Sequence, residues 1–238
     1  MDHHSGWLDV DGIIFDAVGT LIRPTPSVAE AYSAAALRQG VVLSTEETRR
    51  RFQIHFASDG IHADRGLLST DETTEKRRWR EIVAGVLPEI SNPDRAFDEL
   101  WDHFGRPESW RAFPDVAPAL RALESMGVQV CIGSNFDTRL RSVVQGLPEL
   151  EGFSESLVIS SEIGYKKPHR SFFEAACAHL GLSPDRVACV GDDLENDVEG
   201  AVLAGLSGVY LDRSGRGECE FPWVSSLAAL VQARYHRA

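Results

Sequence analysis

Short apolar runs alternate with helical stretches over most of this chain, and this alternation constrains the fold more than any other feature. The runs are mostly apolar rather than alternating with polar residues, which is typical of strands buried on both faces of a parallel sheet. The sequence therefore predicts an α/β fold with a Rossmann-like parallel sheet at its core. The expected strands cover residues 10–16, 128–134, 156–160, 187–192 and 208–212, and the expected helices cover 115–126, 138–146, 169–180 and 195–205.

Residues 23–112 break the alternation and are predicted to form an inserted bundle of helices. The chain is expected to leave the core at Pro24 and Pro26 and to return to it at the sequence FPDV, residues 113–116. We therefore expect a core formed by 7–22 and 113–238, with 23–112 as a helical cap. Four helix-start signals support this expectation: Ser27 with Glu30, Ser44 with Glu47, Ser69 with Glu72, and Asn92 before Pro93.

The composition argues against several kinds of partner. Lys and Arg total 24 against 36 Asp and Glu, and the net charge of −12 disfavours nucleic acid and anionic membrane surfaces. A small anionic substrate stays compatible with this charge. No apolar run reaches the length of a transmembrane helix, and the first ten residues lack the pattern of a signal peptide. The cysteines, Cys131, Cys177, Cys189 and Cys219, show no paired or metal-binding spacing, so a reducing cytoplasm is expected.

Polar side chains follow four of the expected strands. The carboxyl ends of parallel strands share one edge of a sheet, so these side chains are expected in one crevice. An acidic cluster at such a place needs a cation, and carboxylate oxygens suit Mg²⁺. The residues are Asp16 and Thr20 after the first strand, Ser134 and Asn135 after the second, Lys166 and Lys167 after the third, and Asp192, Asp193 and Asp197 after the fourth.

Each feature has a simpler explanation when it is taken alone. An Asp after a strand is often a helix cap, a Ser-Asn pair often forms a turn, and an acidic run is often a solvated loop. Their coincidence at four consecutive strand ends favours a common site.

The same segments resemble the motifs of the haloacid dehalogenase-like superfamily of hydrolases. The matching segments are FDAVGTL (15–21), CIGSN (131–135), GYKKP (164–168) and GDDLENDVEGA (191–201), in the order of that superfamily. Within it, the chain is most similar to the group with a helical cap between the first two motifs, and to the REG-2-like or HAD domain-containing 3 hydrolases. This resemblance implies a core and cap fold and a hydrolase that acts on a small phosphorylated substrate.

The resemblance also implies a role for each residue. Asp16 would be the nucleophile that forms an aspartyl-phosphate, with Thr20, Ser134 and Asn135 around the phosphoryl group. Lys167 would neutralise that group, and Lys166 is the weaker alternative. The expected Mg²⁺ ligands are Asp16, the backbone carbonyl of Val18 and Asp192, with Asp193 or Asp197 completing the set.

Val18 occupies the position at which most phosphatases of this superfamily carry a second Asp, their general acid and base. Valine cannot transfer a proton, although its backbone can still bind a metal. One hypothesis is a phosphohydrolase that favours substrates with acidic leaving groups. A second is that the cap supplies the acid from the segment HFASDGIHAD, which contains His55, Asp59, His62 and Asp64.

Three further hypotheses lie outside phosphate ester hydrolysis. A metal-independent 2-haloacid dehalogenase also lacks the second Asp, but the Asp192 and Asp197 acidic motif argues against it. A phosphonate hydrolase would need a cap lysine, and the only lysine in 23–112 is Lys76. A weakened member that serves as a binding protein is the non-enzymatic alternative.

Overall fold

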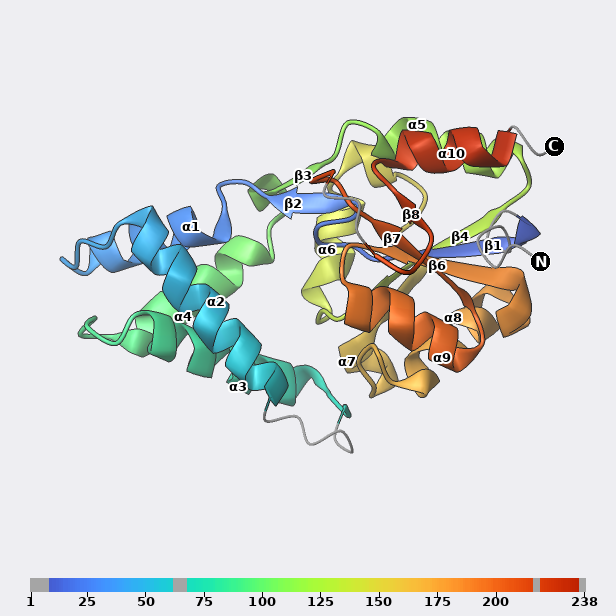
Figure 1. Cartoon of the computed structure of the whole chain (residues 1–238). Coiled ribbons are helices and arrows are strands. Elements are labelled where there is room, and N and C mark those ends of the chain that lie inside the picture. The colour runs from blue at the N-terminus through green and yellow to red at the C-terminus, as the bar shows by residue number, and fades with distance from the viewer. Residues whose placement is uncertain (1–8, 62–67, 216–218, 236–238) are drawn as a thin grey trace.

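The computed structural model describes residues 9–61, 68–215 and 219–235, without the side chains of 58–61. Figure 1 shows two lobes, one built around a sheet and one built from helices. A short antiparallel ribbon, β2 (Ile22–Pro24) paired with β3 (Trp110–Ala112), runs between them. The predicted boundaries, after residues 22 and 112, fall within this ribbon and at its end. The division into domains at these positions stays a prediction.

The sheet lobe confirms the predicted α/β fold with a parallel sheet. Its six strands lie in the order β5-β4-β1-β6-β7-β8, and every neighbouring pair is parallel. The five strands expected from the sequence are all present to within two residues at each end, whereas β8 is too short to leave a pattern. The strands are β1 (Gly12–Phe15), β4 (Gln129–Ser134), β5 (Leu157–Ile159), β6 (Val187–Gly191), β7 (Ser207–Leu211) and β8 (Trp223–Val224).

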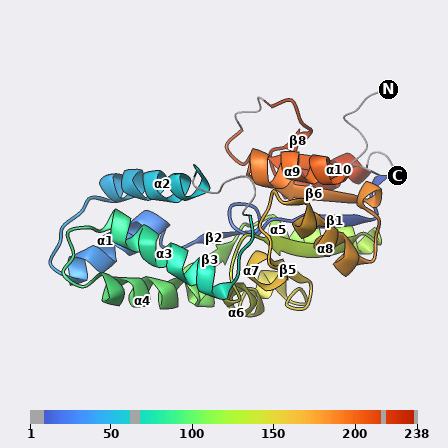
Figure 2. The same cartoon turned by 90° about the horizontal axis from the view of Figure 1, so that it is seen from below.

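Helices cover both faces of the sheet, as buried apolar strands require. Side chains of α5 (Val116–Ser125), α6 (Arg139–Gln145) and α10 (Leu227–Tyr235) share one apolar cluster with Ile13 and Phe15. Ile14 points the other way and packs with α8 (Arg170–Leu180) and α9 (Gly200–Ala204). This alternation along β1 follows from the two-residue period of a strand. In Figure 1, α5 and α10 lie above the sheet and α8 and α9 below it, and Figure 2 shows the helical lobe beside the sheet lobe from below.

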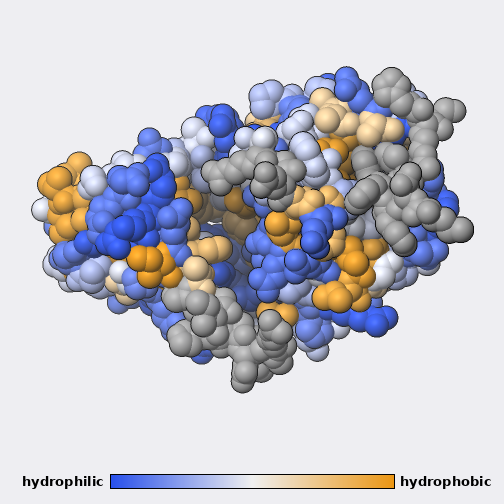
Figure 3. Space-filling view, viewed as in Figure 1, coloured by the Kyte–Doolittle hydropathy of each residue, from blue (hydrophilic) through white to orange (hydrophobic). Residues whose placement is uncertain are grey.

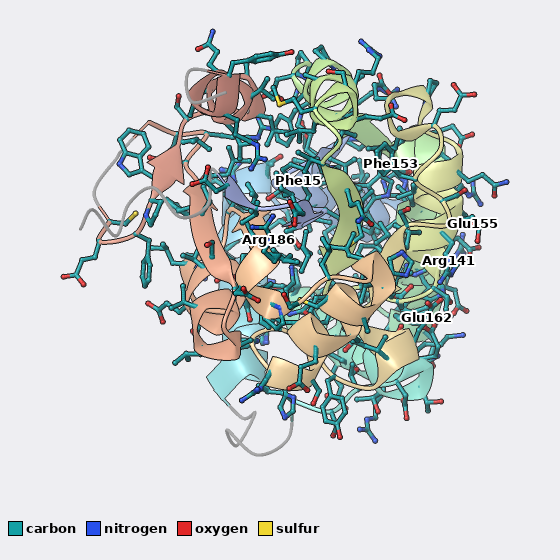
Figure 4. The ribbon with its side chains drawn as sticks, turned by 90° about the vertical axis from the view of Figure 1, so that its right-hand side faces the viewer. Phe15, Arg141, Phe153, Glu155, Glu162 and Arg186 are labelled. Carbon is teal, nitrogen blue, oxygen red and sulfur yellow. The ribbon has the colours of Figure 1, made fainter. Side chains whose placement is uncertain are left out.

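Short helical turns complete the sheet lobe. α7 (Ser160–Ile163) follows β5, and Arg141 of α6 holds it through Glu162, with nitrogen to oxygen distances of 2.7 and 2.6 Å. Figure 4 shows this pair at the edge of the lobe, with Phe15 in its interior. The remaining turns are η2 (Pro107–Ser109), η3 (Pro148–Leu150), η4 (Pro184–Arg186) and the π-helical turn η5 (Leu194–Glu199). No helix among the described residues is long and apolar enough to cross a membrane.

The helical lobe contains α1 (Val28–Arg38), α2 (Thr45–Ile61), α3 (Glu72–Val86) and α4 (Pro93–Phe104). Three of the predicted starts are confirmed, because Ser27, Ser44 and Asn92 each accept a hydrogen bond from a backbone N–H three residues later. The prediction that Ser69 caps the third helix is wrong. Asp71 caps α3 by accepting from the backbone N–H of Thr74 at 2.7 Å.

Ser69 lies three residues before the start of α3, and its backbone pairs with the sheet lobe instead. It forms an antiparallel bridge with Tyr165. The N–H of Lys166 donates to the carbonyl of Leu68 at 2.8 Å, and the N–H of Thr70 donates to the carbonyl of Gly164 at 2.9 Å. The chain directly before α3 is therefore joined by backbone hydrogen bonds to the chain directly before Lys167.

Two glutamates in the first turn of α3 add to these backbone hydrogen bonds, and together they form the docking contact between the two lobes. Glu72 accepts from the N–H of Thr138 at 3.0 Å and from the hydroxyls of Thr138 and Ser161. Glu75 is buried and accepts from Lys166 Nζ at 3.0 Å and from the Thr70 hydroxyl at 2.6 Å. Burial would raise the pKa of Glu75, but Lys166 and Arg78 outweigh it and hold that pKa below its usual value.

Glu75→Gln tests this docking contact. The substitution leaves the Lys166 ammonium beside a neutral partner, so we expect unfolding to cost about 1–3 kcal/mol less. Thermal unfolding at pH 7.5 measures the change. Glu174→Gln is the control, because its ion pair with Arg170 is largely exposed and its loss is expected to leave the melting temperature unchanged. Equal melting temperatures for both variants would contradict a stabilising role for Glu75.

Candidate active site

The carboxyl ends of β1, β4 and β6 meet at the edge of the sheet nearest the helical lobe. These three strands are neighbours in the sheet, so the residues that follow them lie side by side. Asp16 follows β1, Ser134 ends β4 and Asp192 follows β6. Figure 3 shows a recess between the two lobes on this side of the sheet lobe.

Lys167 lies at the centre of this group. Its side chain is 2% exposed, and its Nζ donates to Asp16 Oδ1 at 2.8 Å, to Asp197 Oδ1 at 2.6 Å and to the carbonyl of Gly133 at 2.8 Å. Three acceptors match the three protons of an ammonium group. Burial alone would lower the pKa of Lys167, but the charges of Asp16 and Asp197 outweigh it and raise that pKa.

Asn135 holds the backbone of Lys167. Its side-chain amide donates to the Lys167 carbonyl at 2.9 Å, and its side-chain oxygen accepts from the Lys167 N–H at 2.7 Å. Ser134, which is buried, lies between Asn135 and Gly133, whose carbonyl accepts from the lysine ammonium. The loop after β4 therefore fixes the lysine at both its backbone and its side chain.

Only one of the two adjacent lysines reaches Asp16. Lys166 extends toward the helical lobe and pairs with Glu75 of α3 instead. The alternative that Lys166 serves the site has no support from these contacts.

Three carboxylates gather beside Lys167. Oxygen atoms of Asp16, Asp192 and Asp197 all lie within 4.8 Å of one another. Burial raises the pKa of Asp16, with Lys167 opposing and Asp192 adding to the rise. Loss of water around the carboxyl group raises the pKa of Asp192 to about 6, although part of that residue is exposed, and the charge of Asp197 contributes. Burial likewise raises the pKa of Asp197 to about 6.

Asp193 does not join this cluster. Its carboxylate accepts from the N–H of Asn196 at 3.0 Å and from the Asn196 side chain at 2.8 Å, which caps η5. Its backbone N–H donates to Asp197 Oδ2 at 3.1 Å. Of the two alternatives left open by the sequence, the geometry brings Asp197 to Asp16 and leaves Asp193 at the start of the turn.

The loop after Asp16 packs closely against Asp192. Thr20 is fully buried and its hydroxyl donates to Asp192 Oδ1 at 3.1 Å. Gly19 has a φ of +95°, and a Cβ at this position would lie 2.2 Å from Asp192 Oδ2. Both the backbone conformation and the lack of space therefore require glycine here.

Val18 is 37% exposed in the same loop. The carbonyl of Ala17 accepts from the N–H groups of Leu21 and Ile22, whereas no hydrogen bond within the described part of the chain engages the Val18 carbonyl. Hard oxygen donors are the preferred ligands of Mg²⁺, so the three carboxylates suit such an ion, and the expected role of the Val18 carbonyl stays a prediction.

The predicted acid segment of the helical lobe gains no support from the described side chains. His55 packs within that lobe, where a Cβ on Gly85 of α3 would lie 2.4 Å from its Nδ1. The side chain of Asp59, and His62 and Asp64 entirely, lie outside the described residues. Lys76 places its ammonium 5.6 Å from the ring centre of Trp101.

Sequence reasoning missed the contacts that Glu72 and Glu75 make with the sheet lobe. It also missed Arg213, whose guanidinium donates to the carbonyl of Thr20 in the loop after Asp16. The two glutamates look like an ordinary acidic first helical turn, and only the folded chain shows that they contact the sheet lobe. Arg213 directly follows the strand pattern at 208–212, and no motif marks it.

A sequence model described as haloacid dehalogenase-like hydrolase matches residues 10–205. The chain belongs to this family. Among named relatives, it is 28% identical over 207 residues to the haloacid dehalogenase-like hydrolase domain-containing protein 3 of Mus musculus, covering 82% of this chain and 78% of that protein. This similarity confirms the predicted resemblance to that group.

Two other similarities bear on the chemistry and the fold. The chain is 30% identical over 180 residues to a protein from Methanopyrus kandleri named glyceraldehyde 3-phosphate phosphatase. The alignment covers 65% of this chain and 76% of that protein. Among solved structures, the defluorinating L-2-haloacid dehalogenase Rha0230 superposes with a TM-score of 0.74 at 18% identity, covering 96% of each chain. The latter similarity concerns the fold alone.

The raised pKa of Asp192 predicts that the effect of Asp192→Asn on the stability of the fold depends on pH when EDTA is present. The pKa of Asp192 is about 6 in the folded protein and near 3.8 in a free side chain, so this group stabilises the fold most below pH 4. That contribution is lost as the pH rises through 6. We therefore expect the stability of the variant, relative to wild type, to increase between pH 5 and pH 7.5 in urea unfolding. If the difference in stability between variant and wild type is the same at both pH values, the raised pKa of Asp192 is contradicted.

Proposed function

We propose that this family member is a Mg²⁺-dependent phosphohydrolase that acts on a small phosphorylated molecule through a phosphoryl group carried by Asp16. The observation that carries the proposal is the meeting of Asp16, Asp192 and Asp197 around the buried Lys167. Three acids held this closely favour a bound cation, and one ammonium beside the nucleophile favours an anionic substrate. The phosphatase named among the relatives supports the same class of reaction.

The proposed reaction has two displacements. An oxygen of the Asp16 carboxylate attacks phosphorus, the bond between phosphorus and the leaving oxygen breaks, and an acyl phosphate forms on Asp16. Water then attacks that phosphorus, which releases inorganic phosphate and restores the carboxylate. Lys167 keeps Asp16 oriented through Oδ1 and neutralises charge on the phosphoryl group, while Ser134 binds one of its oxygens.

Asp192, Asp197 and Asp16, together with the Val18 carbonyl, would hold the metal ion. When bound, Mg²⁺ supplies positive charge that stabilises the phosphoryl oxygens. Thr20 orients Asp192 through its hydroxyl, and Asn135 keeps Lys167 in place through its backbone.

The helical lobe, residues 23–112, is proposed to act as a cap over this site, and 7–22 with 113–238 as the core. The contacts of Glu72 and Glu75 support this arrangement, because they join α3 to the loops that carry Ser134 and Lys167. A cap excludes water from the phosphoryl group and selects the substrate by the side chains it presents. A cytoplasmic location and the absence of nucleic-acid and membrane partners stay predictions from the sequence.

The first test is release of p-nitrophenol from p-nitrophenyl phosphate, with Mg²⁺ or with EDTA, by wild type and Asp16→Asn. We expect turnover only in wild type with Mg²⁺, because the amide is a poor nucleophile and the carboxylates need a cation. Asp193→Asn is the matched control, because Asp193 lies outside the cluster, and it is expected to retain activity. Turnover by Asp16→Asn would overturn the assignment of the nucleophile.

Val18→Asp tests whether the lack of a general acid at position 18 limits the rate of hydrolysis. In wild type the leaving oxygen receives no proton from position 18, so its own acidity limits the rate. We expect the variant to raise turnover of an alkyl phosphate by a factor on the order of 10² while changing the aryl ester less. Val18→Asn introduces a similar polar side chain that cannot transfer a proton, and it is expected to show no such gain. The same gain in both variants would contradict acid catalysis at this position.

A metal-independent 2-haloacid dehalogenase is the second candidate, because Val18 replaces the acid and the fold matches dehalogenases. In that reaction the Asp16 carboxylate would displace chloride from carbon, and water would hydrolyse the resulting ester. Chloride release from 2-chloropropionate in EDTA is the deciding assay, and a positive result would replace the phosphohydrolase proposal. Failure of both assays would favour a binding protein that keeps the fold.

A further inference from the structure

Arg213 lies two residues after the end of β7, beyond residues 10–205 that match the family. Its guanidinium donates to the carbonyl of Thr20 at 2.8 Å and to both carboxylate oxygens of Asp115 at 3.0 and 3.1 Å. The same group stacks on the ring of Phe113, 3.9 Å from the ring centre. The C-terminal part of the chain therefore reaches the loop that follows Asp16 through this side chain.

Thr20 transmits this contact to the acidic cluster. Its carbonyl accepts from Arg213, and its hydroxyl donates to Asp192 Oδ1 at 3.1 Å. We propose that Arg213 is a positioning residue that holds Asp192, through Thr20, in the orientation needed to bind the cation. This inference rests on the proposed function, because it assumes that Asp192 is a metal ligand.

Arginine suits this position better than any other residue. Its planar fork can bind the Asp115 carboxylate with two nitrogens and still direct an N–H to the Thr20 carbonyl. Asp115 is itself fixed, because it also accepts from the N–H of Leu227, the first residue of α10, at 2.9 Å. The guanidinium thus contacts Asp115, the ring of Phe113 and the Thr20 carbonyl together.

The loop between Asp16 and β2 explains why one such contact matters. The N–H groups of Leu21 and Ile22 both return to the Ala17 carbonyl, so the loop is tight. Gly19 and Thr20 of this loop both lie against Asp192. Release of the Thr20 carbonyl would allow this side of the loop to shift, and Asp192 would lose the donor that sets its orientation.

The test is calorimetric titration with Mg²⁺ of wild type, Arg213→Met and Arg213→Lys. Loss of an outer contact of a metal site typically weakens binding by about 10–100-fold, and we expect about tenfold for Arg213→Met. Arg213→Lys keeps the positive charge beside Asp115 but not the fork, so an intermediate loss is expected. This second variant keeps the test valid if the methionine variant fails to fold.

Arg186→Met is the matched control. Two nitrogens of Arg186 also donate to a carboxylate, that of Asp11, at 2.6 Å each. Arg186 directly precedes β6, whereas Asp192 directly follows it, so the two residues lie at opposite ends of that strand. The Mg²⁺ affinity of Arg186→Met is expected to equal that of wild type. Equal losses in Arg186→Met and Arg213→Met would overturn the inference, because a general effect of lost ion pairs would then explain both.

A double-mutant cycle with Thr20→Val separates positioning from mere stability. Valine keeps the backbone carbonyl that Arg213 binds but removes the hydroxyl that reaches Asp192. If Arg213 acts through that hydroxyl, Arg213→Met weakens Mg²⁺ binding in wild type and has little further effect in Thr20→Val. Independent, multiplying losses would overturn the inference. Absence of Mg²⁺ binding by wild type would instead overturn the proposed function, and this inference with it.

Discussion

The ammonium group of Lys167 is the interaction on which the arrangement of the site depends. It is buried, and it donates to two carboxylates and one carbonyl that come from three different parts of the chain. A buried charge is tolerated only when such partners surround it. The same partners need the lysine equally, because Asp16 and Asp197 would otherwise lie close together as two like charges. The site is therefore stabilised as a unit, and removal of any one member leaves the others in an unfavourable environment.

The sheet, its order of elements and the residues at its edge could be predicted because each depends on local sequence. Buried strands of three to six residues leave apolar runs, and motif residues follow them closely. The contacts across the two lobes could not be predicted, because they depend on which residues become neighbours after folding. Ser69 illustrates the difference: its helix-start signal is genuine in local terms, but pairing with Tyr165 takes its backbone, and Asp71 caps the helix instead.

The choice between alternatives also required three-dimensional information. The sequence places Lys166 beside Lys167 and Asp193 near Asp197, with no local reason to prefer one of either pair. The fold separates them, since Lys166 is drawn to Glu75 and Asp193 caps η5, while Lys167 and Asp197 face each other. Arg213 left no signal at all, because its contacts are with a backbone carbonyl and with an aspartate far away in the sequence.

The central position of β1 has a consequence for how the chain folds. Gly12 pairs with Gln129 on one side and with Val187 on the other, so β1, the first strand of this sheet in chain order, must wait for partners that follow much later. Contacts of such long range slow folding, because the closure of large loops comes before any gain from pairing. The helices of residues 28–104 contact one another locally and can form while the ribosome is still producing the rest of the sheet. The nascent chain must therefore keep an apolar strand unpaired during this interval, which makes it a candidate for chaperone binding.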